Sequence, residues 1–381
     1  MVELYEKNGK KVVLCAPTGR AAKRMTETTG VEAKTIHRLL EIGKIEDDKI
    51  HNIDINLTPI SGDIIVIDEA SMVDCYLMNY ILKAIYVGSK LILVGDSNQL
   101  PSVGPGCILK DLIDSEKFAC VSLNKIFRQA AKSKIIVNAH DVNNGISFIG
   151  KKYDEEQEDD FFYVNESVQE KILSQVISLC KERLANYGNY DFFDNIQVLT
   201  PTKRGMLGTK ELNSYLQQSL NPERKNKFEK QYGKTLFREG DRVMQIKNNY
   251  EIYWEKGKEY GSGIFNGELG IILKIDNFDK TMEVEFDDGK IARYNFAELD
   301  ELDLAYSITI HKAQGSEFDV VIMVIPWASS KLLTRNLLYT GMTRAKKMLI
   351  LIGSKNIIEN MINNPEIQKR NTGLLFKLIN D

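Results

Sequence analysis

The fold of this chain is decided by one stretch, Asp63-Ile64-Ile65-Val66-Ile67-Asp68-Glu69-Ala70-Ser71. Its four consecutive β-branched residues are typical of a strand that is buried on both faces, as the strands of a parallel sheet are. Two acids, Asp68 and Glu69, follow that strand at once. Because open α/β sheets bind ligands beyond the carboxyl ends of their strands, we expect the two carboxylates to face a ligand.

The two acids have the layout of a Walker B element. In that element the first carboxylate holds Mg²⁺ and the second activates water for attack on a γ-phosphate. The loop that usually accompanies it, G-x-x-x-x-G-K-[ST], occurs nowhere in the 381 residues. That loop supplies the backbone amides and the lysine that hold the β- and γ-phosphates. The sequence therefore predicts the metal-binding and water-activating side of a nucleotide site without its phosphate loop.

Length and composition are those of a globular protein with two or three domains. The 381 residues are 43% hydrophobic and 27% charged, which is ordinary for a soluble chain. No apolar run approaches the ~18 residues that cross a membrane, and the charged start lacks the apolar core of a signal peptide. Five widely spaced cysteines without a C-x-x-C pair predict reduced thiols, with no disulfide or metal cluster. We expect a cytoplasmic protein.

Short buried strands alternate with helical stretches over residues 11–125, which predicts a doubly wound parallel sheet. Residues 41–58 interrupt this rhythm with a polar segment typical of a small hairpin insertion. The strands and helices that we expect around the acid-tipped strand are Lys11–Cys15, Ala21–Thr28, Thr35–Ile42, Tyr76–Tyr86 and Lys90–Val94.

The pattern changes twice further along the chain. Helical segments dominate after residue 121, and from about 240 to 300 the hydrophobic period becomes two, which indicates a small all-β barrel. The α/β rhythm returns with the apolar run Val320–Ile325. The barrel is therefore expected to be inserted into a second α/β domain. The predicted domains are 1–121 with the insertion 41–58, then 122–239 together with 301–381, and the barrel 240–300.

The loop Gly95–Pro101 follows a buried strand and is a candidate sensor, with Gln99 touching the γ-phosphate or the attacking water. By itself it reads as a capped turn, because its residues are turn formers. On the same sheet edge as the two acids, the sensor interpretation is favoured. Arg128 and Arg344 are candidate arginine fingers, since a planar guanidinium suits the charge of a phosphoryl-transfer transition state. An isolated arginine on a helix is more often a plain surface residue.

DNA binding is predicted from particular segments, because a net charge of −3 does not itself indicate it. The segment Ser307–Glu317 is rich in groups that bond phosphate and sugar, the atoms that receive half or more of protein–nucleic acid hydrogen bonds. The segments Ala16–Arg20 and Thr35–Arg38 offer similar donors. A structural role is the alternative for His311.

Taken in order, these segments resemble the motif series of superfamily-1 DNA helicases, and most closely the RecD-like group. Ala16 to Ala22 is similar to motif Ia, and Thr35 to Leu40 to the motif that follows it. The other matching segments, for motifs II to VI, are Asp68–Ser71, Gly95–Pro101, Phe127–Gln129, Thr309–Glu317 and Leu338–Lys347. Each motif is weak alone, but together in this order they are specific and cover nearly the whole chain.

The resemblance implies two RecA-like domains with ATP and Mg²⁺ bound between them and single-stranded DNA lying across both. It assigns Asp68 to Mg²⁺ and Glu69 to the general base. The other residues that it assigns to the nucleotide are Gln99, Arg128, Gly315, Glu317 and Arg344. The residues that it assigns to DNA are Pro17, Thr18, Gly19, Arg20, His37, Pro201, Thr202, Lys203, Thr309, His311 and Gln314.

The resemblance further implies a strand-separating rod at 41–58, an SH3-like barrel at 240–300, movement from 5′ to 3′, and a monomeric motor that engages duplex/single-strand junctions. The chain departs from the family at its start. Residues Val2 to Asn8 look like the end of the helix that follows a phosphate loop. We therefore expect a helicase fragment that turns over ATP poorly as it stands.

The preferred function is ATP-driven translocation on single-stranded DNA, with unwinding of duplex in repair or recombination. Two alternatives stay open. One is the helicase part of a conjugative relaxase, which would need a further catalytic domain. The other is a non-catalytic single-stranded DNA-binding module, which the missing loop favours and the retained Asp68, Glu69, Gln99, Arg128 and Arg344 disfavour.

Overall fold

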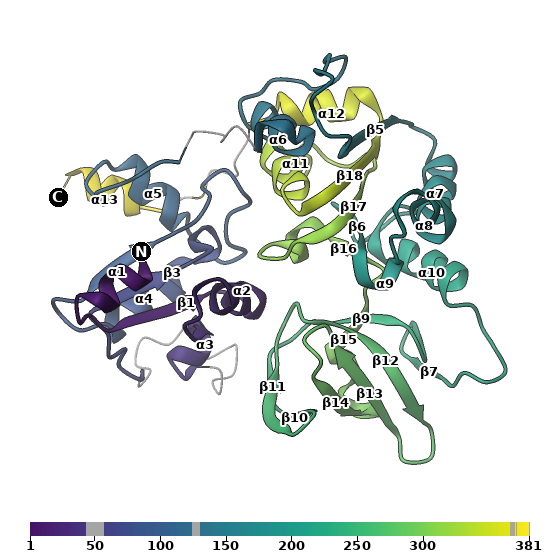
Figure 1. Ribbon diagram of the computed structural model, residues 1–381, viewed down its shortest axis with the longest axis horizontal. Coiled ribbons are helices and arrows are strands. Elements are labelled where there is room, and N and C mark those ends of the chain that lie inside the picture. The colour runs from purple at the N-terminus through teal and green to yellow at the C-terminus, as the bar shows by residue number, and fades with distance from the viewer. Residues whose placement is uncertain (43–56, 124–129, 366–369, 371, 381) are drawn as a thin grey trace. The chain divides into compact units, whose positions relative to one another are not determined.

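The computed structural model describes residues 1–42, 57–123, 130–365, 370 and 372–380. The chain divides into two compact units, of which the first holds residues 1–124 and 368–381 and the second holds residues 125–367 (Figure 1). Each unit is built on its own parallel sheet. The described residues contain no helix that is both long enough and apolar enough to cross a membrane.

The first unit carries a four-stranded, all-parallel sheet in the order β2-β1-β3-β4. Its acid-tipped strand lies between two neighbours, and all four of its residues are buried as the β-branched run predicts. The predicted doubly wound parallel sheet is therefore confirmed. The strands are β1 (Val12–Ala16), β2 (Ala33–Thr35), β3 (Ile64–Ile67) and β4 (Lys90–Leu93).

Helices cover both faces of this sheet, because successive residues of a strand point to opposite faces. Ile65 and Ile67 of β3 pack in one core with the helices α3, α4 and α5. Ile64 and Val66 pack on the other face with side chains of α1 and α2. The helices are α1 (Val2–Lys7), α2 (Gly19–Thr29), α3 (Ile36–Leu39), α4 (Cys75–Ala84), α5 (Ile108–Asp114) and α13 (Leu374–Asn380).

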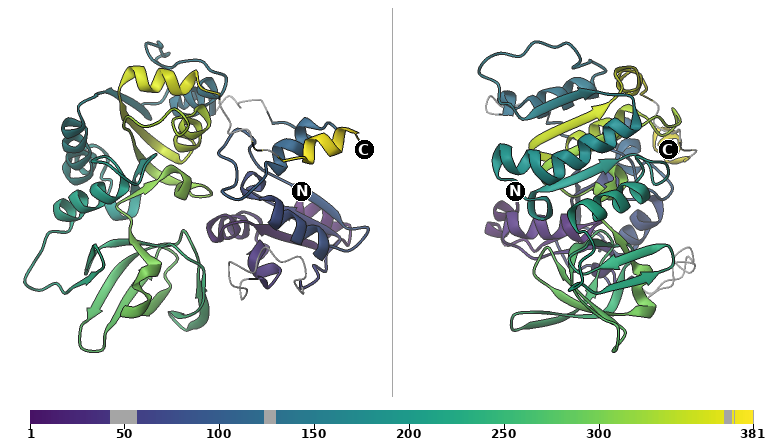
Figure 2. Two further views of the ribbon diagram at one scale, coloured as in Figure 1. Left: turned by 180° about the vertical axis from the view of Figure 1, so that it is seen from behind. Right: turned by 90° about the vertical axis from the view of Figure 1, so that its right-hand side faces the viewer.

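The C-terminal segment belongs to the first unit by its contacts. Helix α13 packs on α5, and both views of the chain show the two helices side by side (Figures 1 and 2). Thr372 Oγ1 donates a 3.0 Å hydrogen bond to Asp111 Oδ2 of α5. The sequence prediction grouped all of 301–381 with the second α/β domain, so the structure differs from it at this last segment. The difference arises from contacts between residues more than 250 positions apart, which no local pattern reveals.

The second unit is built on a five-stranded, all-parallel sheet in the order β16-β6-β17-β18-β5. Helices lie on both of its faces (Figure 1). The strands are β5 (Phe161–Asn165), β6 (Ile196–Thr200), β16 (Ser307–Thr309), β17 (Phe318–Ile325) and β18 (Ala345–Gly353). The helices are α6 (Lys134–Asn143), α7 (Gln169–Ser178), α8 (Leu184–Gly188), α9 (Phe192–Asn195), α10 (Thr209–Leu220), α11 (Arg335–Met342) and α12 (Lys355–Ile362).

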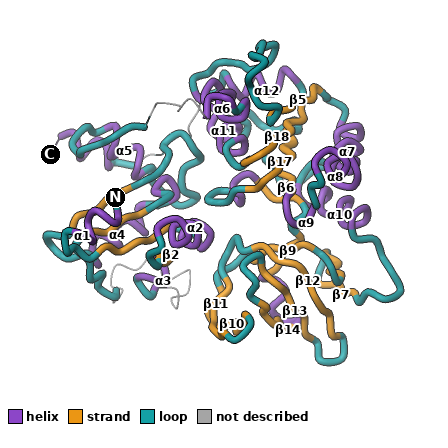
Figure 3. Tube along the Cα trace, in the orientation of Figure 1, coloured by secondary structure: helices purple, strands orange, loops and turns teal. Residues whose placement is uncertain are grey.

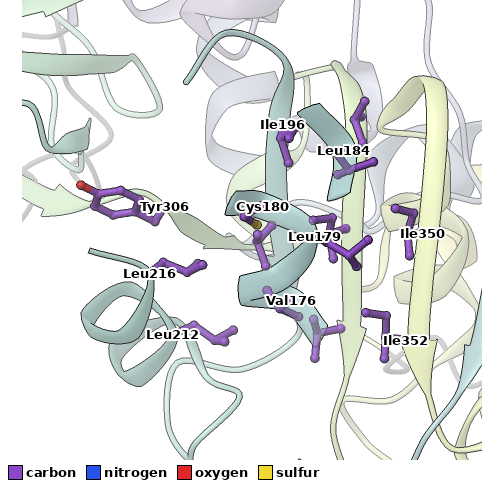
Figure 4. Close-up of a cluster of buried hydrophobic side chains, with 14 of the residues drawn as sticks. Val176, Leu179, Cys180, Leu184, Ile196, Leu212, Leu216, Tyr306, Ile350 and Ile352 are labelled. Atoms are coloured by element: carbon purple, nitrogen blue, oxygen red, sulfur yellow. The ribbon is translucent and has the colours of Figure 1, made fainter. Parts of the chain in front are cut away.

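One core of this unit joins alternate residues of β6, β17 and β18 to the helices α7, α8 and α10. Figure 4 shows Val176 and Leu184 from the helical side facing Ile350 and Ile352 of β18. Between α7 and α8 the chain makes one π-helical turn, Leu179–Arg183, that keeps the helix continuous. This packing positions the carboxyl ends of β6 and β16 side by side.

An antiparallel sheet of seven strands, in the order β11-β10-β14-β13-β12-β9-β15, is inserted between β6 and β16 (Figure 3). The predicted turn at Asp287-Asp288-Gly289 joins β13 to β14, with Gly289 at a φ of 81°. The insertion of a β domain into the second α/β domain is confirmed. The strands are β9 (Arg242–Gln245), β10 (Asn249–Lys256), β11 (Glu259–Ile264), β12 (Leu269–Asp276), β13 (Thr281–Phe286), β14 (Ile291–Asn295) and β15 (Leu302–Leu304). A separate hairpin pairs β7 (Glu229–Tyr232) with β8 (Thr235–Arg238).

Candidate nucleotide and DNA sites

Asp68 and Glu69 stand at the carboxyl end of β3, as the sequence predicts. The backbone N–H of Asp68 donates to Cys15 O of β1 at 3.0 Å, so the turn is anchored to the neighbouring strand. Asp68 Oδ1 accepts from the N–H of Glu69 at 2.8 Å. Glu69 adopts a left-handed backbone, with φ 51° and ψ 40°, and starts the short 3₁₀ helix η3 (Ala70–Met72). Such strain in a non-glycine residue is concentrated at functional sites.

The loop after β4 packs directly on this turn. Ala70 N–H donates to Val94 O at 2.9 Å. A Cβ atom added to Gly95 would lie 2.9 Å from the backbone nitrogen of Ala70 and 3.1 Å from that of Ser71. Glycine is therefore required at Gly95 by the close approach of two backbones. The two loops that the sequence singles out on this sheet edge lie in contact.

Two buried oxygens at this edge have no hydrogen-bond partner among the residues that the structure describes. They are Ser71 Oγ and Gln99 Oε1. The other end of the Gln99 amide is held, because its Nε2 lies 3.5 Å from Asp96 Oδ2. A buried polar atom without a partner costs about 1–3 kcal/mol, so such atoms call for a ligand or water. Both oxygens suit a bound hydrated cation or a water molecule.

These residues fit a magnesium–nucleotide complex better than a free metal ion. Among the described residues, no group of three or more His, Cys, Asp or Glu side chains could hold a metal. Mg²⁺ is commonly bound by one or two carboxylates together with substrate phosphates and water, and not by an all-protein cage. Asp68, with the unpartnered oxygens of Ser71 and Gln99 nearby in the same pair of loops, matches that chemistry.

The first unit also places predicted DNA contacts at the same sheet edge. Pro17 and Thr18 follow β1, and Thr18 Oγ1 accepts from Ala21 N at 3.3 Å, which caps α2. Gly19 and Arg20 form the first turn of that helix. His37 lies in α3, after β2. Because the strands are parallel, these segments share the edge that carries the two acids.

In the second unit, the predicted DNA contacts follow two neighbouring strands, β6 and β16. Thr309 ends β16 and pairs in register with Thr200 of β6. Thr309 Oγ1 caps the 3₁₀ helix η7 (Ile310–Ala313) by accepting from Lys312 N at 3.3 Å. His311 lies exposed on η7, and Lys203 is exposed after β6. The structure thus brings two distant segments of the sequence together.

The other predicted DNA contacts of the second unit differ in how much of each side chain is exposed to solvent. Thr202 Oγ1 donates to Arg204 O at 2.8 Å, whereas Pro201 and Gln314 are buried. Desolvation lowers the pKa of Lys312, an effect opposed by Asp303 and reinforced by the positive charge of Lys203. The His311 side chain keeps an exposed face, yet the surrounding chain removes enough water to lower its pKa below the ordinary 6.5.

Arg344 is buried, with 3% of its surface exposed. Its guanidinium donates to Thr340 O, Ser316 O and Thr343 Oγ1, each at 3.1 Å. These bonds tie the end of α11 to the loop that follows η7. Gly315, at a φ of 70°, and Glu317, 3.8 Å from Lys346 Nζ, lie on that same loop. Arg344 therefore has a local structural role that sequence reasoning did not foresee.

Two of the predicted features fall on residues that the structure does not describe. Arg128 lies outside the described residues, as does most of the predicted rod, residues 43–56. Arg370 was missed entirely, although it donates several hydrogen bonds to the first unit. Its acceptors are far away in the sequence, so no motif signals it.

Comparison with known proteins supports the same order of domains. An AAA domain family matches residues 1–157, the SH3 domain of ATP-dependent RecD-like DNA helicases matches residues 212–286, and a UvrD-like helicase C-terminal domain matches residues 304–352. The crystal structure of a Pif1 helicase from Bacteroides, in complex with ADP-AlF3 and single-stranded DNA, has a TM-score of 0.51. It is 19% identical and covers 94% of this chain and 86% of its own, which shows a shared fold.

Relatives with sequence similarity cover nearly the whole chain. The ATP-dependent RecD2 DNA helicase of Deinococcus radiodurans is 34% identical over 378 residues, which are 99% of this chain and 48% of that protein. The RecD subunit of the RecBCD enzyme from Buchnera aphidicola subsp. Schizaphis graminum is 28% identical over 429 residues, covering 92% of this chain and 67% of that subunit. This chain therefore spans about half the length of the RecD2 helicase.

These matches confirm the resemblance to RecD-like DNA helicases that the order of the motifs predicts. The similarity extends over nearly the whole of this chain.

Proposed function

We propose that this chain is the motor part of an ATP-driven DNA helicase that moves 5′ to 3′ along single-stranded DNA and separates duplex in repair or recombination. The names of its relatives support this proposal, because they are an ATP-dependent DNA helicase and a subunit of the RecBCD enzyme. We further propose a monomeric motor that acts at junctions of duplex and single strand. Five free cysteines fit a reducing, cytoplasmic setting.

The observation that carries the proposal is the sheet edge at Asp68, Glu69 and Gln99. In the proposed reaction Asp68 holds the metal and Glu69 accepts a proton from the attacking water. Gln99 Oε1, unpartnered among the described residues, reads the γ-phosphate or orients the water. When bound, Mg²⁺ would supply charge neutralisation at the phosphates. The proposed nucleotide contacts among residues 125–367 are Arg128, Gly315, Glu317 and Arg344.

The proposed DNA track uses both groups of strand-end residues. In the first unit they are Pro17, Thr18, Gly19, Arg20 and His37. In the second unit they are Pro201, Thr202, Lys203, Thr309, His311 and Gln314. Lys203 follows β6 and His311 follows β16, and these two strands are neighbours in the sheet. Both side chains are exposed and can reach a phosphate directly. The buried Pro201 and Gln314 would act through the shape of the loops that carry them.

We also propose that these 381 residues alone turn over ATP slowly, because they contain no G-x-x-x-x-G-K-[ST] motif. Without its amides and lysine, the γ-phosphate is held weakly. DNA binding, by contrast, uses residues that are all present.

The test is binding of a single-stranded oligonucleotide, measured by fluorescence anisotropy over a range of salt concentrations. Affinity is expected to fall steeply as salt rises, because each phosphate contact releases counterions. Lys203→Ala should weaken binding and flatten the salt dependence, whereas Lys23→Ala, an exposed lysine on α2, serves as the control. Absence of binding, or binding that ignores salt, would contradict the proposal.

A further inference from the structure

Arg370 holds a loop of the first unit through several hydrogen bonds. Its Nη1 donates to Gly106 O at 2.8 Å and to Ser102 Oγ at 3.2 Å, and also to Gly104 O. Its Nη2 donates to Ser102 O. One guanidinium thus bonds three backbone carbonyls and a hydroxyl within five consecutive residues. Hydrogen bonds from a charged donor are stronger than neutral ones.

The loop that Arg370 holds, residues 102–106, continues directly from the proposed sensor loop. Gln99 lies three residues before Ser102, which is only 4% exposed. Ser102 Oγ donates to Gly104 O at 3.2 Å, so the loop is also closed on itself. Movement of Ser102 would therefore displace the end of the segment that carries Gln99.

The same loop packs on the start of α4, which follows the two acids. Cys75 N–H donates to Pro105 O at 2.9 Å. A Cβ on Gly104 would lie 1.9 Å from Asp74 Oδ2, and one on Gly106 would lie 2.2 Å from Cys75 Sγ. Asp74 caps α4 by accepting from Leu77 N at 2.8 Å. Residues 102–106 therefore fit tightly against the helix start.

From the start of α4 the contacts lead back to Glu69. Val73 N–H donates to Ala70 O at 3.2 Å, and Met72 N–H donates to Glu69 O at 3.0 Å. These bonds form η3, whose first turn contains the strained Glu69 backbone. Arg370 is thus joined by packed backbone to both loops of the proposed nucleotide edge, and all of these residues belong to the first unit.

We propose that Arg370 is a positioning residue, which fixes residues 102–106 and through them sets the positions of the Glu69 turn and the Gln99 loop. Its relevance to ATP hydrolysis rests on the proposed function, whereas its effect on the loops does not. The C-terminal segment then completes the nucleotide edge of the first unit, although the segment follows the second sheet in the sequence. Helix α13 and the Thr372–Asp111 bond bring Arg370 to its acceptors.

Amide hydrogen exchange, read by mass spectrometry on this chain, tests the proposal. Arg370→Ala should speed exchange about tenfold in peptides covering residues 70–75 and 95–106, because the bonds that protect Ala70 and Cys75 are loosened. Peptides from β18 should exchange as in the wild type. Arg370→Lys keeps the charge but not the forked geometry, so we expect partial rescue. Lys377→Ala, on the exposed side of α13, is the matched control.

Wild-type exchange rates over residues 70–75 and 95–106 in folded Arg370→Ala would overturn the proposal. So would wild-type exchange rates in Arg370→Met, in which the side chain fills space but donates no hydrogen bond. If Arg370→Ala does not fold, Arg370→Lys carries the test, with an intermediate rate expected and a wild-type rate overturning it. A failure of the proposed function would be distinct, since loops could loosen as expected in a chain that never binds nucleotide.

Discussion

The first unit carries polar loops at the carboxyl edge of its four-stranded sheet, whereas the second unit carries a polar cluster around Arg344 at the amino edge of β17 and β18 in its five-stranded sheet. At the first edge, Ser71 and Gln99 each keep a buried oxygen that has no partner among the described residues. At the second edge, the Arg344 guanidinium donates to three local oxygens. The first edge therefore keeps buried oxygens that a ligand could bind. At the second edge, the guanidinium is already hydrogen-bonded to nearby loops.

This difference separates two kinds of functional residue. A side chain with open hydrogen-bonding capacity can be changed with little loss of stability and a large loss of function. A side chain that is already engaged affects stability first. Substitutions at the two edges should therefore have opposite consequences for stability and for function.

The largest expected effect on stability is that of Arg344→Ala. It leaves Thr340 O and Ser316 O buried without their charged donor and opens a cavity, so the free energy of unfolding should fall by about 3 kcal/mol. Chemical denaturation followed by Trp fluorescence measures it, with exposed Lys346→Ala as the control. A stability equal to that of the wild type would show that the three local hydrogen bonds of Arg344 do not stabilise the fold.

Gly95→Ala should have the next largest effect. An added Cβ would press on the backbone nitrogens of Ala70 and Ser71, which cannot move aside as a flexible side chain can. We expect a loss of about 1–3 kcal/mol in unfolding free energy. Gly373→Ala is the control, because no atom lies within 4 Å of its added Cβ. Equal stability of the two variants would mean that the two loops are not in contact.

The third prediction concerns DNA binding and pH. The pKa of His311 is lowered by desolvation from its ordinary 6.5, so the imidazole is neutral at pH 7. If His311 faces a phosphate, DNA binding favours its protonated form. The affinity for DNA should then rise roughly threefold as the pH falls below the lowered pKa of His311. The same protonation lowers stability, because the unfolded state takes up this proton at higher pH. Anisotropy titrations should show a flatter pH profile for His311→Ala; an identical profile would remove His311 from the DNA track.

The smallest effect is expected for Ser71→Ala. The Ser71 hydroxyl has no hydrogen-bond partner among the described residues, so its removal should not lower the unfolding free energy and should raise it by about 1 kcal/mol at most, because an unsatisfied buried group is lost. Ser102→Ala is the contrasting variant, since that hydroxyl bonds Gly104 O and accepts from Arg370, and it should cost more. A large loss in Ser71→Ala would indicate that the first edge is as fully engaged as the second.

Local patterns predicted the elements that carry the proposed chemistry. The β-branched run at Ile64–Ile67 and the acids after it have few alternative explanations, and the change to period two marked the inserted β domain. The hairpin of β10 and β11 was not predicted, because β10 is largely exposed and mixes charged with aromatic residues on both faces. These two strands form because they pair with neighbouring strands, and their own residue pattern does not indicate them.

Two features could not be predicted from the sequence. They are the contacts between residues far apart in the chain, and whether a given polar atom already has a hydrogen-bond partner. The bonds of Arg370 to residues 102–106 join positions 264 to 268 apart. Similarly, nothing in the motif around Arg344 indicates that three acceptors already surround it. Residue type suggested an arginine finger, whereas burial decides how much of the guanidinium a ligand can reach.

The hydrolysis rate in the presence of single-stranded oligonucleotide tests directly whether the first edge hydrolyses ATP. The polypeptide to measure carries a phosphate-binding loop joined before residue 1, and wild type is compared with Glu69→Gln. We predict DNA-stimulated turnover that Glu69→Gln reduces about 10²–10⁴-fold while nucleotide still binds, as loss of a general base would. Turnover by Glu69→Gln at the wild-type rate would contradict the role of Glu69 as the general base.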